Sequence, residues 1–267
     1  MARVMIALVA LALLAVSQGP IAGEARAASY TERTQALLGN LPTGVTIATA
    51  VERRIFTRLN QLRSGKRLPQ LTAHQGLADA ARVHSLRMQR DRFFAHDDPD
   101  GRGASDRVAA MERQAVFSQI GENLAQISPI IRGVADDMHD GWVKSPGHYR
   151  NMIKPDYDHV GVGCVQDGRK TICTQVFALV AGRFLTPVPV KIHRSSPPNV
   201  VAQFPKLDFG GWLLTDRQGK EHTRGTGDTL DAPRSLRGEF LLRPIGVKRE
   251  ERRIIYHHFF GPSVVLK

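Results

Sequence analysis

The chain has 267 residues, 42% of them hydrophobic and 23% charged, which excludes a disordered or low-complexity polypeptide. This length is enough for one domain of about 150 residues and a smaller second one. For the formal charge of +12 we favour a solvated basic surface; the acidic partners available outside the cytosol, anionic lipid head groups and anionic envelope polymers, are the alternative. We expect no nucleic-acid binding, because the sequence contains neither zinc-finger spacing nor an aromatic RNA-binding motif.

The first 27 residues have the layout of a secretory signal peptide. A positive residue precedes an apolar run from Val4 to Val16, and the small-residue site Ala25-Arg26-Ala27 follows. The apolar run is shorter than the roughly 20 residues that span a bilayer, although an uncleaved anchor is the alternative. We therefore predict a signal peptide over 1–27, cleaved after Ala27 or Ala28, and a secreted or periplasmic product.

Two helices are predicted after a weakly patterned lead over 28–44. The first has apolar residues at helical spacing and ends at Ser64-Gly65; these residues are Val51, Ile55, Leu59 and Leu62. Thr72 is the predicted N-cap of the second helix, whose apolar stripe includes His84. For His84 we favour a buried, hydrogen-bonded imidazole over a ligand role.

A turn and two shorter elements follow. We predict that residues 97–101 form a turn with solvated carboxylates, because the ligand spacing of a calcium-binding loop is absent. Ser105 is the predicted N-cap of a short helix. The segment Gly121-Glu122-Asn123-Leu124-Ala125 is predicted to start a new element after a loop.

The next helix is predicted to present Ile131, Val134, Met138 and Trp142 on one face. Pro146 disfavours helical geometry at Ser145, so the helix should end near Lys144. His148 then lies on a rigid corner, a good position for a site. Ser145, His148 and Glu122 could form a triad of the kind used in nucleophilic catalysis. We favour helix capping or turn formation for Ser145, because the strand–turn–helix context of a nucleophile is missing.

Two antiparallel strands, 157–166 and 170–184, are predicted around Asp167-Gly168. The two cysteines of the chain, Cys164 and Cys173, flank this turn. A two-residue turn would place them diagonally, whereas a four-residue turn, 167–170, places them directly opposite each other. We predict the longer turn and a disulfide bond, as expected in an oxidising compartment.

Helices followed by strands indicate an α+β fold with helices layered on an antiparallel sheet. A Pro-rich linker is predicted over 185–205, and short strand candidates beyond it indicate a small β module over 206–267. From Arg183 onward there are 15 Lys or Arg against 8 Asp or Glu, net +7. A solvated basic surface is the simpler interpretation of this excess. The alternative is that the C-terminal module binds an anionic envelope surface.

Five segments in order resemble the bacterial branch of the CAP superfamily, which unites cysteine-rich secretory proteins, antigen 5 and pathogenesis-related 1 proteins and is also called the SCP-like extracellular domain. The segments are FFAHDDPDGR, GENLA, GWVKSPGHYRNMI, HVGVG and TICTQVF. The resemblance implies an α-β-α sandwich, the CAP fold, over 45–184. It does not cover the last 85 or so residues.

The resemblance also implies a groove in which two histidines and two acidic residues can hold a divalent metal. His96 and His148 match the histidines and Glu122 matches one acid, but Ser145 stands where many eukaryotic members have the second. Two imidazoles and one carboxylate could hold zinc with a position left for water, or form a hydrogen-bonded cluster without metal. Other residues expected to line the groove are Asn123, Trp142, Tyr149 and, on the apolar side, Met152.

Three functions are compatible with these residues. The first is an exported, non-enzymatic module that binds an apolar or envelope-derived ligand in the His/Glu-lined groove. The second is a metal-assisted hydrolase of envelope peptide or polysaccharide, with Glu122 as the general base. The third is a structural envelope protein. We favour binding, because the sequence offers no dedicated nucleophile and no second carboxylate near the histidines.

Overall fold

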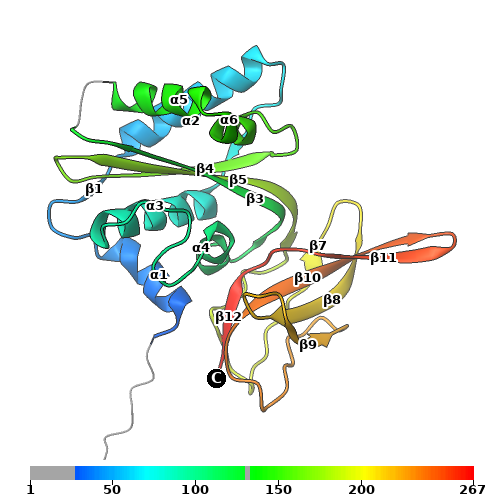
Figure 1. Ribbon diagram of the computed structural model, residues 1–267. Coiled ribbons are helices and arrows are strands. Elements are labelled where there is room, and N and C mark those ends of the chain that lie inside the picture. The colour runs from blue at the N-terminus through cyan, green and yellow to red at the C-terminus, as the bar shows by residue number, and fades with distance from the viewer. Residues whose placement is uncertain (1–27, 130–132) are drawn as a thin grey trace, which may run out of the picture.

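A computed structural model describes residues 28–129 and 133–267, so the predicted signal peptide and Ile131 lie outside the described residues. Within these ranges the chain forms two mixed sheets with helices around the first of them (Figure 1). The helices are α1 Tyr30–Gly39, α2 Thr49–Gly65, α3 Gln75–Arg90, α4 Ala104–Met111, α5 Val134–Lys144 and α6 Pro146–Met152. None of them is long and apolar enough to cross a membrane.

The first sheet has the strand order β1-β4-β5-β3, with β2 beside β4 and β7 beside β5. Its long strands are antiparallel neighbours, as predicted, and only β2 is parallel to its partner. The strands are β1 Thr46–Ile47, β2 Thr72–Ala73, β3 Ala115–Ile127, β4 His159–Gln166, β5 Thr171–Phe184 and β7 Ala202–Gln203. Strand β3 is therefore at one edge of the sheet, and β4 with its short partners lies towards the opposite edge.

Helices cover both faces of the first sheet, which confirms the predicted α-β-α sandwich. Figure 1 shows α2, α5 and α6 on one face and α1, α3 and α4 on the other. Ile55 and Leu59 of α2 are fully buried against α5 and the sheet, as their helical spacing predicts. On the opposite face α3 lies so close to β4 that a side chain at Gly161 or Gly163 would collide with the helix backbone.

Four local predictions are wrong. Helix α3 begins at Gln75 with His74 as its N-cap, because Thr72 pairs with β4 instead. Helix α4 has Gly103 as its N-cap, and the Asp106 carboxylate accepts from the Gly103 amide. Glu122 lies in the middle of β3 rather than at the start of an element. In the 97–101 turn, Asp98 is buried and ion-paired with Arg87 instead of solvated.

The hairpin between β4 and β5 has the predicted four-residue turn. Gln166 pairs with Thr171, which leaves 167–170 as the turn, and Asp167 N donates to Lys170 O. Cys164 therefore lies directly opposite Cys173, and a disulfide bond joins them. Both cysteines are buried between the sheet and the α2 side of the molecule. The geometry follows from register alone, since one residue more or less in the turn would separate the two sulfurs.

The second sheet forms the predicted C-terminal β module. Its strand order is β6-β12-β10-β8-β9, with β11 beside β10. The strands are β6 Lys191–Ile192, β8 Asp208–Thr215, β9 Glu221–Gly225, β10 Gly238–Glu250, β11 Arg253–His258 and β12 Ser263–Leu266. Short strands with frequent turns account for the absence of helical periodicity in this part of the sequence.

The two sheets share one apolar core. Phe184 of β5 packs with Trp212 and Leu242 of the second sheet, and Phe117 of β3 forms a backbone bridge to Phe260. The 185–205 segment, expected as a linker, contributes β6 and β7 and buries Val188, Ile192 and Val200 in this core. Its prolines thus lie in a chain that is packed along both sheets.

Helix α1 joins the start of the described chain to the second sheet. Ser29 caps it through a capping box with Glu32. The carboxylate of Glu239, on β10, accepts from the Tyr30 and Thr31 amides at 3.0 Å each. These amides are among the donors that a helix N-terminus leaves unpaired, so a distant acidic residue completes the cap. The weak pattern of 28–44 gave no indication of this helix.

Candidate functional site

Three segments meet at the outer edge of β3. Side chains alternate between the two faces of a strand, so Glu122 faces the layer of α3 and α4, whereas Asn123 faces α6. His96 lies in the loop between α3 and α4, and His148 lies on α6. The strand edge thus receives one imidazole from each helical layer, with the Glu122 carboxylate beneath.

Glu122 is held by a buried cation and a partly exposed imidazole. Its Oε2 accepts from Arg107 Nη2 at 2.7 Å, and its Oε1 lies 2.8 Å from His96 Nδ1. Arg107 is fully buried and also donates to the carbonyls of Arg102 and His96, at 2.8 and 3.0 Å. His84 Nε2 lies 3.9 Å from Glu122 Oε1 and 2.9 Å from Ala95 O. Both carboxylate oxygens therefore have partners within the protein.

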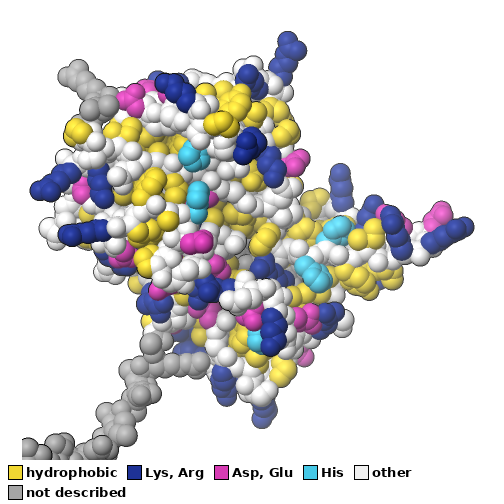
Figure 2. Space-filling model, in the orientation of Figure 1, with side chains coloured by type: hydrophobic (Ala, Val, Ile, Leu, Met, Phe, Trp, Pro, Cys, Tyr) yellow, Lys and Arg dark blue, Asp and Glu magenta, His cyan; other side chains and the backbone are white. Residues whose placement is uncertain are grey.

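His148 is positioned through two asparagines. Asn123 Nδ2 donates to His148 O at 3.1 Å, and Asn151 Nδ2 donates to Glu122 O at 3.1 Å. A further bond at 3.0 Å links Asn151 Nδ2 to Asn123 Oδ1. These bonds fasten α6 to the edge of β3. Figure 2 shows two histidine side chains close together on the helix-bearing half of the molecule, with an acidic side chain next to them.

The imidazoles of the site have pKa values that diverge. The hydrogen bond to Glu122 raises the pKa of His96 above its usual range, whereas partial burial and the charge of His96 lower the pKa of His148. Burial lowers the pKa of His84 to about 4. For Glu122, burial alone would raise the pKa, but the His96 hydrogen bond and the Arg107 charge reverse this and lower it. The site thus pairs a readily protonated imidazole with a neutral one.

Imidazole resonances followed by NMR between pH 4 and 8 should separate these histidines. We expect His96 to titrate above about 6.5, His148 below it and His84 at about 4. The raised pKa of His96 stabilises the fold below about pH 6.5, and this contribution is lost as the pH rises through the folded pKa. His84 acts in the opposite sense, because the unfolded chain takes up its proton first as the pH falls from 6.5 to 4. Identical titration of His96 and His148 would contradict the arrangement.

The model of the CAP family, described as the cysteine-rich secretory protein family, matches residues 56–177. Residues 56–177 of this chain are thus similar in sequence to the CAP family. The matched segment contains His96, Glu122 and His148, the strands β2, β3 and β4, and the first half of β5. The C-terminal β module lies outside it.

Two curated relatives come from Bacillus subtilis strain 168. The uncharacterized protein YkwD is 28% identical over 131 residues, 48% of this chain and 47% of the relative. The uncharacterized membrane protein YlbC is 32% identical over 117 residues, 44% of this chain and 32% of the relative. This chain thus spans less than half the length of either. A solved structure of an extracellular protein containing an SCP domain, from Bacillus anthracis strain Ames, has 33% identity and a TM-score of 0.42, over 49% of this chain and 40% of that one.

Several residues expected to line a groove of the CAP domain have other positions. Trp142 is buried, with its Nε1 donating to Leu124 O at 2.7 Å, and Met152 is also in the core. Asn123 is fully buried and positions His148. Ser145 joins α5 to α6 without a capping bond from its side chain, and Tyr149 is half-buried on α6. Helical spacing identified Trp142 as apolar-facing, and that face is the core.

The three expected metal ligands do not form a ligand set. Within the described ranges, no group of three or more His, Cys, Asp or Glu side chains is arranged to hold a metal ion. Glu122 engages Arg107 and His96 with its two oxygens, and His96 engages Glu122 with Nδ1. Of the two arrangements expected for His96, His148 and Glu122, these contacts favour the hydrogen-bonded cluster, and we derive no step through a metal.

Arg107 was missed by the sequence analysis. It precedes Val108 on a short helix, where an arginine is normally solvated. The available signal was its spacing of four residues from the apolar Met111, which places both side chains on one side of α4. His84 was correctly predicted as a buried, hydrogen-bonded imidazole. Its position close to Glu122 could be seen only in the folded structure.

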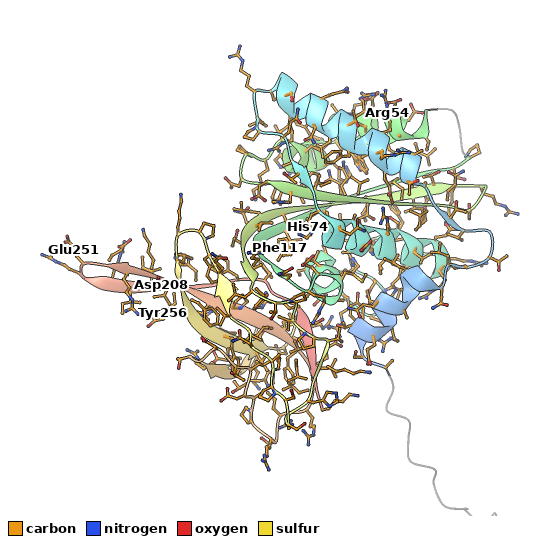
Figure 3. All side chains as sticks on the ribbon, turned by 180° about the vertical axis from the view of Figure 1, so that it is seen from behind. Arg54, His74, Phe117, Asp208, Glu251 and Tyr256 are labelled. Atoms are coloured by element: carbon orange, nitrogen blue, oxygen red, sulfur yellow. A yellow bond between two sulfur atoms is a disulfide. The ribbon has the colours of Figure 1, made fainter. Side chains whose placement is uncertain are left out.

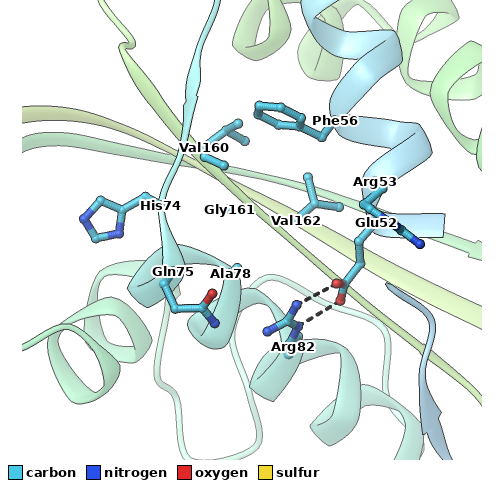
Figure 4. A pocket seen from close by; sticks show the side chains of 11 residues that line it. Glu52, Arg53, Phe56, His74, Gln75, Ala78, Arg82, Val160, Gly161 and Val162 are labelled. Carbon is cyan, nitrogen blue, oxygen red and sulfur yellow. Dashed lines mark hydrogen bonds and ion pairs between the residues drawn. The ribbon is translucent and has the colours of Figure 1, made fainter. Parts of the chain in front are cut away.

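A separate apolar cavity of about 330 Å³ lies beside β4, towards the edge of the sheet opposite β3. Phe56, Val160 and Val162 line it, and Arg82 forms a two-point ion pair with Glu52 at 2.9 and 2.7 Å along its border (Figure 4). The apolar and the histidine-lined surfaces, expected together in one groove, are therefore distinct.

Proposed function

We propose that this chain is an exported, non-enzymatic binding protein that holds a cell-envelope ligand with an acidic group at the surface of His96 and His148. The main support is that both carboxylate oxygens of Glu122 are bonded within the protein, to His96 and Arg107. With Nδ1 of His96 bound to Glu122, its Nε2 is left to face a ligand. The side chain of His96 is 59% exposed, so a ligand can reach it.

The charge of the site supports an acidic ligand group. Glu122 and Arg107 balance each other, so protonation of His96 adds a positive charge at a half-exposed position next to Asp97. An imidazolium beside a neutral imidazole can donate to a carboxylate or phosphate, and bonds to charged groups are the stronger ones. A purely apolar ligand is less suited to this surface, because Trp142 and Met152 are in the core.

The contacts of Glu122 argue against the hydrolytic alternative. A general base needs an oxygen within reach of the attacking water. Both oxygens of Glu122 are engaged, and its side chain is almost entirely buried. Export itself remains part of the proposal and derives from the predicted signal peptide.

The test is a titration of the protein with soluble peptidoglycan fragments released by a muramidase, monitored by imidazole NMR and calorimetry. We expect His96→Gln and His148→Gln each to weaken binding by about tenfold or more, since a bond to a charged group is lost. The matched control is His193→Gln, an exposed histidine of the 185–205 segment. Unchanged affinity in both site variants, no binding of any fragment, or binding only with added zinc would each overturn the proposal.

A further inference from the structure

The hairpin formed by β10 and β11 extends beyond the body of the C-terminal sheet. The two strands pair from Ile245 with His258 to Glu250 with Arg253. Strand β8 supports β10 only as far as Val247, which pairs with Asp208. The last residues of the hairpin therefore lack a third strand, and Figures 1 and 3 show it projecting into solvent. Among the described strands, β11 pairs only with β10.

One face of this hairpin carries apolar side chains as far as Ile254, near its tip. Directly opposed residues of antiparallel strands share a face, so Val247 and Tyr256 lie together and Ile254 lies beside Arg249. Near the body the face is covered, since Val247 packs with Ile245 and Leu213 in a small buried cluster. Towards the tip it is open, with Tyr256 61% and Ile254 48% exposed. The tip of the hairpin therefore presents two neighbouring apolar side chains to solvent.

Basic residues are concentrated at the tip of the hairpin, where Arg249 lies directly opposite Ile254. The 248–253 segment has four basic residues, Lys248, Arg249, Arg252 and Arg253, against two acidic ones. Glu250 pairs with Lys248 at 2.9 Å and with Arg253 at 2.6 Å. Arg249 is 3.9 Å from Asp208 and remains largely exposed. Figure 2 shows the blue Lys and Arg side chains at the projecting end and a yellow apolar strip behind them.

We propose that this hairpin is a docking surface for an anionic lipid membrane. A tyrosine and an isoleucine can enter the interfacial region while flanking arginines contact lipid phosphates. Each basic residue near an anionic surface strengthens binding by about fivefold. A lipid surface fits better than a folded partner, because the exposed apolar residues are few and basic residues are concentrated at the tip next to them. This proposal goes beyond the ligand site, which lies on the first sheet.

The test is co-sedimentation of the full exported chain with vesicles of phosphatidylcholine containing 30% phosphatidylglycerol, compared with pure phosphatidylcholine. We expect binding to the anionic vesicles only, weakened by salt. The double variant Ile254→Ser/Tyr256→Ser and the pair Arg249→Gln/Arg252→Gln should each lower the partition coefficient by about tenfold or more. Leu185→Ser is the matched control, because Leu185 is equally exposed and lies outside the hairpin.

Melting temperatures show whether the variants remain folded. They should equal that of the unchanged protein, because these side chains are exposed. Binding that is the same in all variants would overturn the proposal. So would binding to pure phosphatidylcholine, or retention by an anionic wall polymer without vesicles. A dimer that forms without lipid and is lost in the Ile254→Ser/Tyr256→Ser variant would instead identify the hairpin as a contact between copies of this chain.

Discussion

Glu122→Gln is expected to lower the free energy of unfolding by about 3–5 kcal/mol, measured by urea denaturation at pH 7. Removing this carboxylate charge leaves Arg107 buried without its counterion, which costs far more than the pair itself contributes. Glu221→Gln, in an exposed pair with Arg224, is the matched control and should change little. A double variant, Glu122→Gln/Arg107→Met, should recover part of the loss because no unpaired charge remains buried.

The same variant has a predicted pH dependence. The pKa of Glu122 is lowered in the folded state, so its stabilising effect is complete above about pH 4.5 and is lost as the pH falls through the folded pKa. The difference between the unchanged protein and Glu122→Gln should therefore shrink in acid. A difference that stays constant from pH 7 to pH 3 would show that charge is not the cause.

Arg63→Met is expected to destabilise the protein by a similar amount, about 3–5 kcal/mol. Arg63 is fully buried and donates to the carbonyls of Pro69, Met152, Lys154 and Tyr157, at 2.8 to 3.3 Å. Methionine fills much of the space but leaves these acceptors unpaired, and each unpaired buried acceptor costs about 1–3 kcal/mol.

The measurement is again urea denaturation, with Arg53→Met as the control on the exposed side of the same helix. Arg63→Lys should fall between the two, because one ammonium cannot reach all four carbonyls. If Arg63→Met is as stable as Arg53→Met, the loops that Arg63 joins must be held by other contacts.

Local signals predicted the elements whose causes lie within a few residues. The spacing of Ile55 and Leu59 identified α2, and Pro146 correctly ended α5 at Lys144. The position of the two cysteines relative to Asp167-Gly168 predicted the register of the hairpin and its disulfide. In each case residues that are neighbours in the sequence determine the local structure.

The errors arose where a distant partner decides the local geometry. Thr72 is a good N-cap in isolation, but β4 offers it a strand partner. Asp98 belongs to a run of acidic residues that is typical of a solvated turn, but its carboxylate pairs with Arg87 and is buried. The convergence of His96 and Glu122 was available only through family resemblance, and no spacing within the chain predicted that Arg107 would occupy the second oxygen.

The capping of α1 by Glu239 has a consequence for the order of folding. The Thr31 hydroxyl contacts both Glu239 and Ser263, and Ser263 in turn donates to Ala109 O at 3.1 Å. Thr31 and Ser263 are separated by 232 positions. Closing so large a loop is slow compared with local contacts. The N-cap of α1 is therefore complete only when β10 is in place, whereas the body of the helix also contacts α4, where Gln35 Nε2 donates to Ala110 O at 2.8 Å.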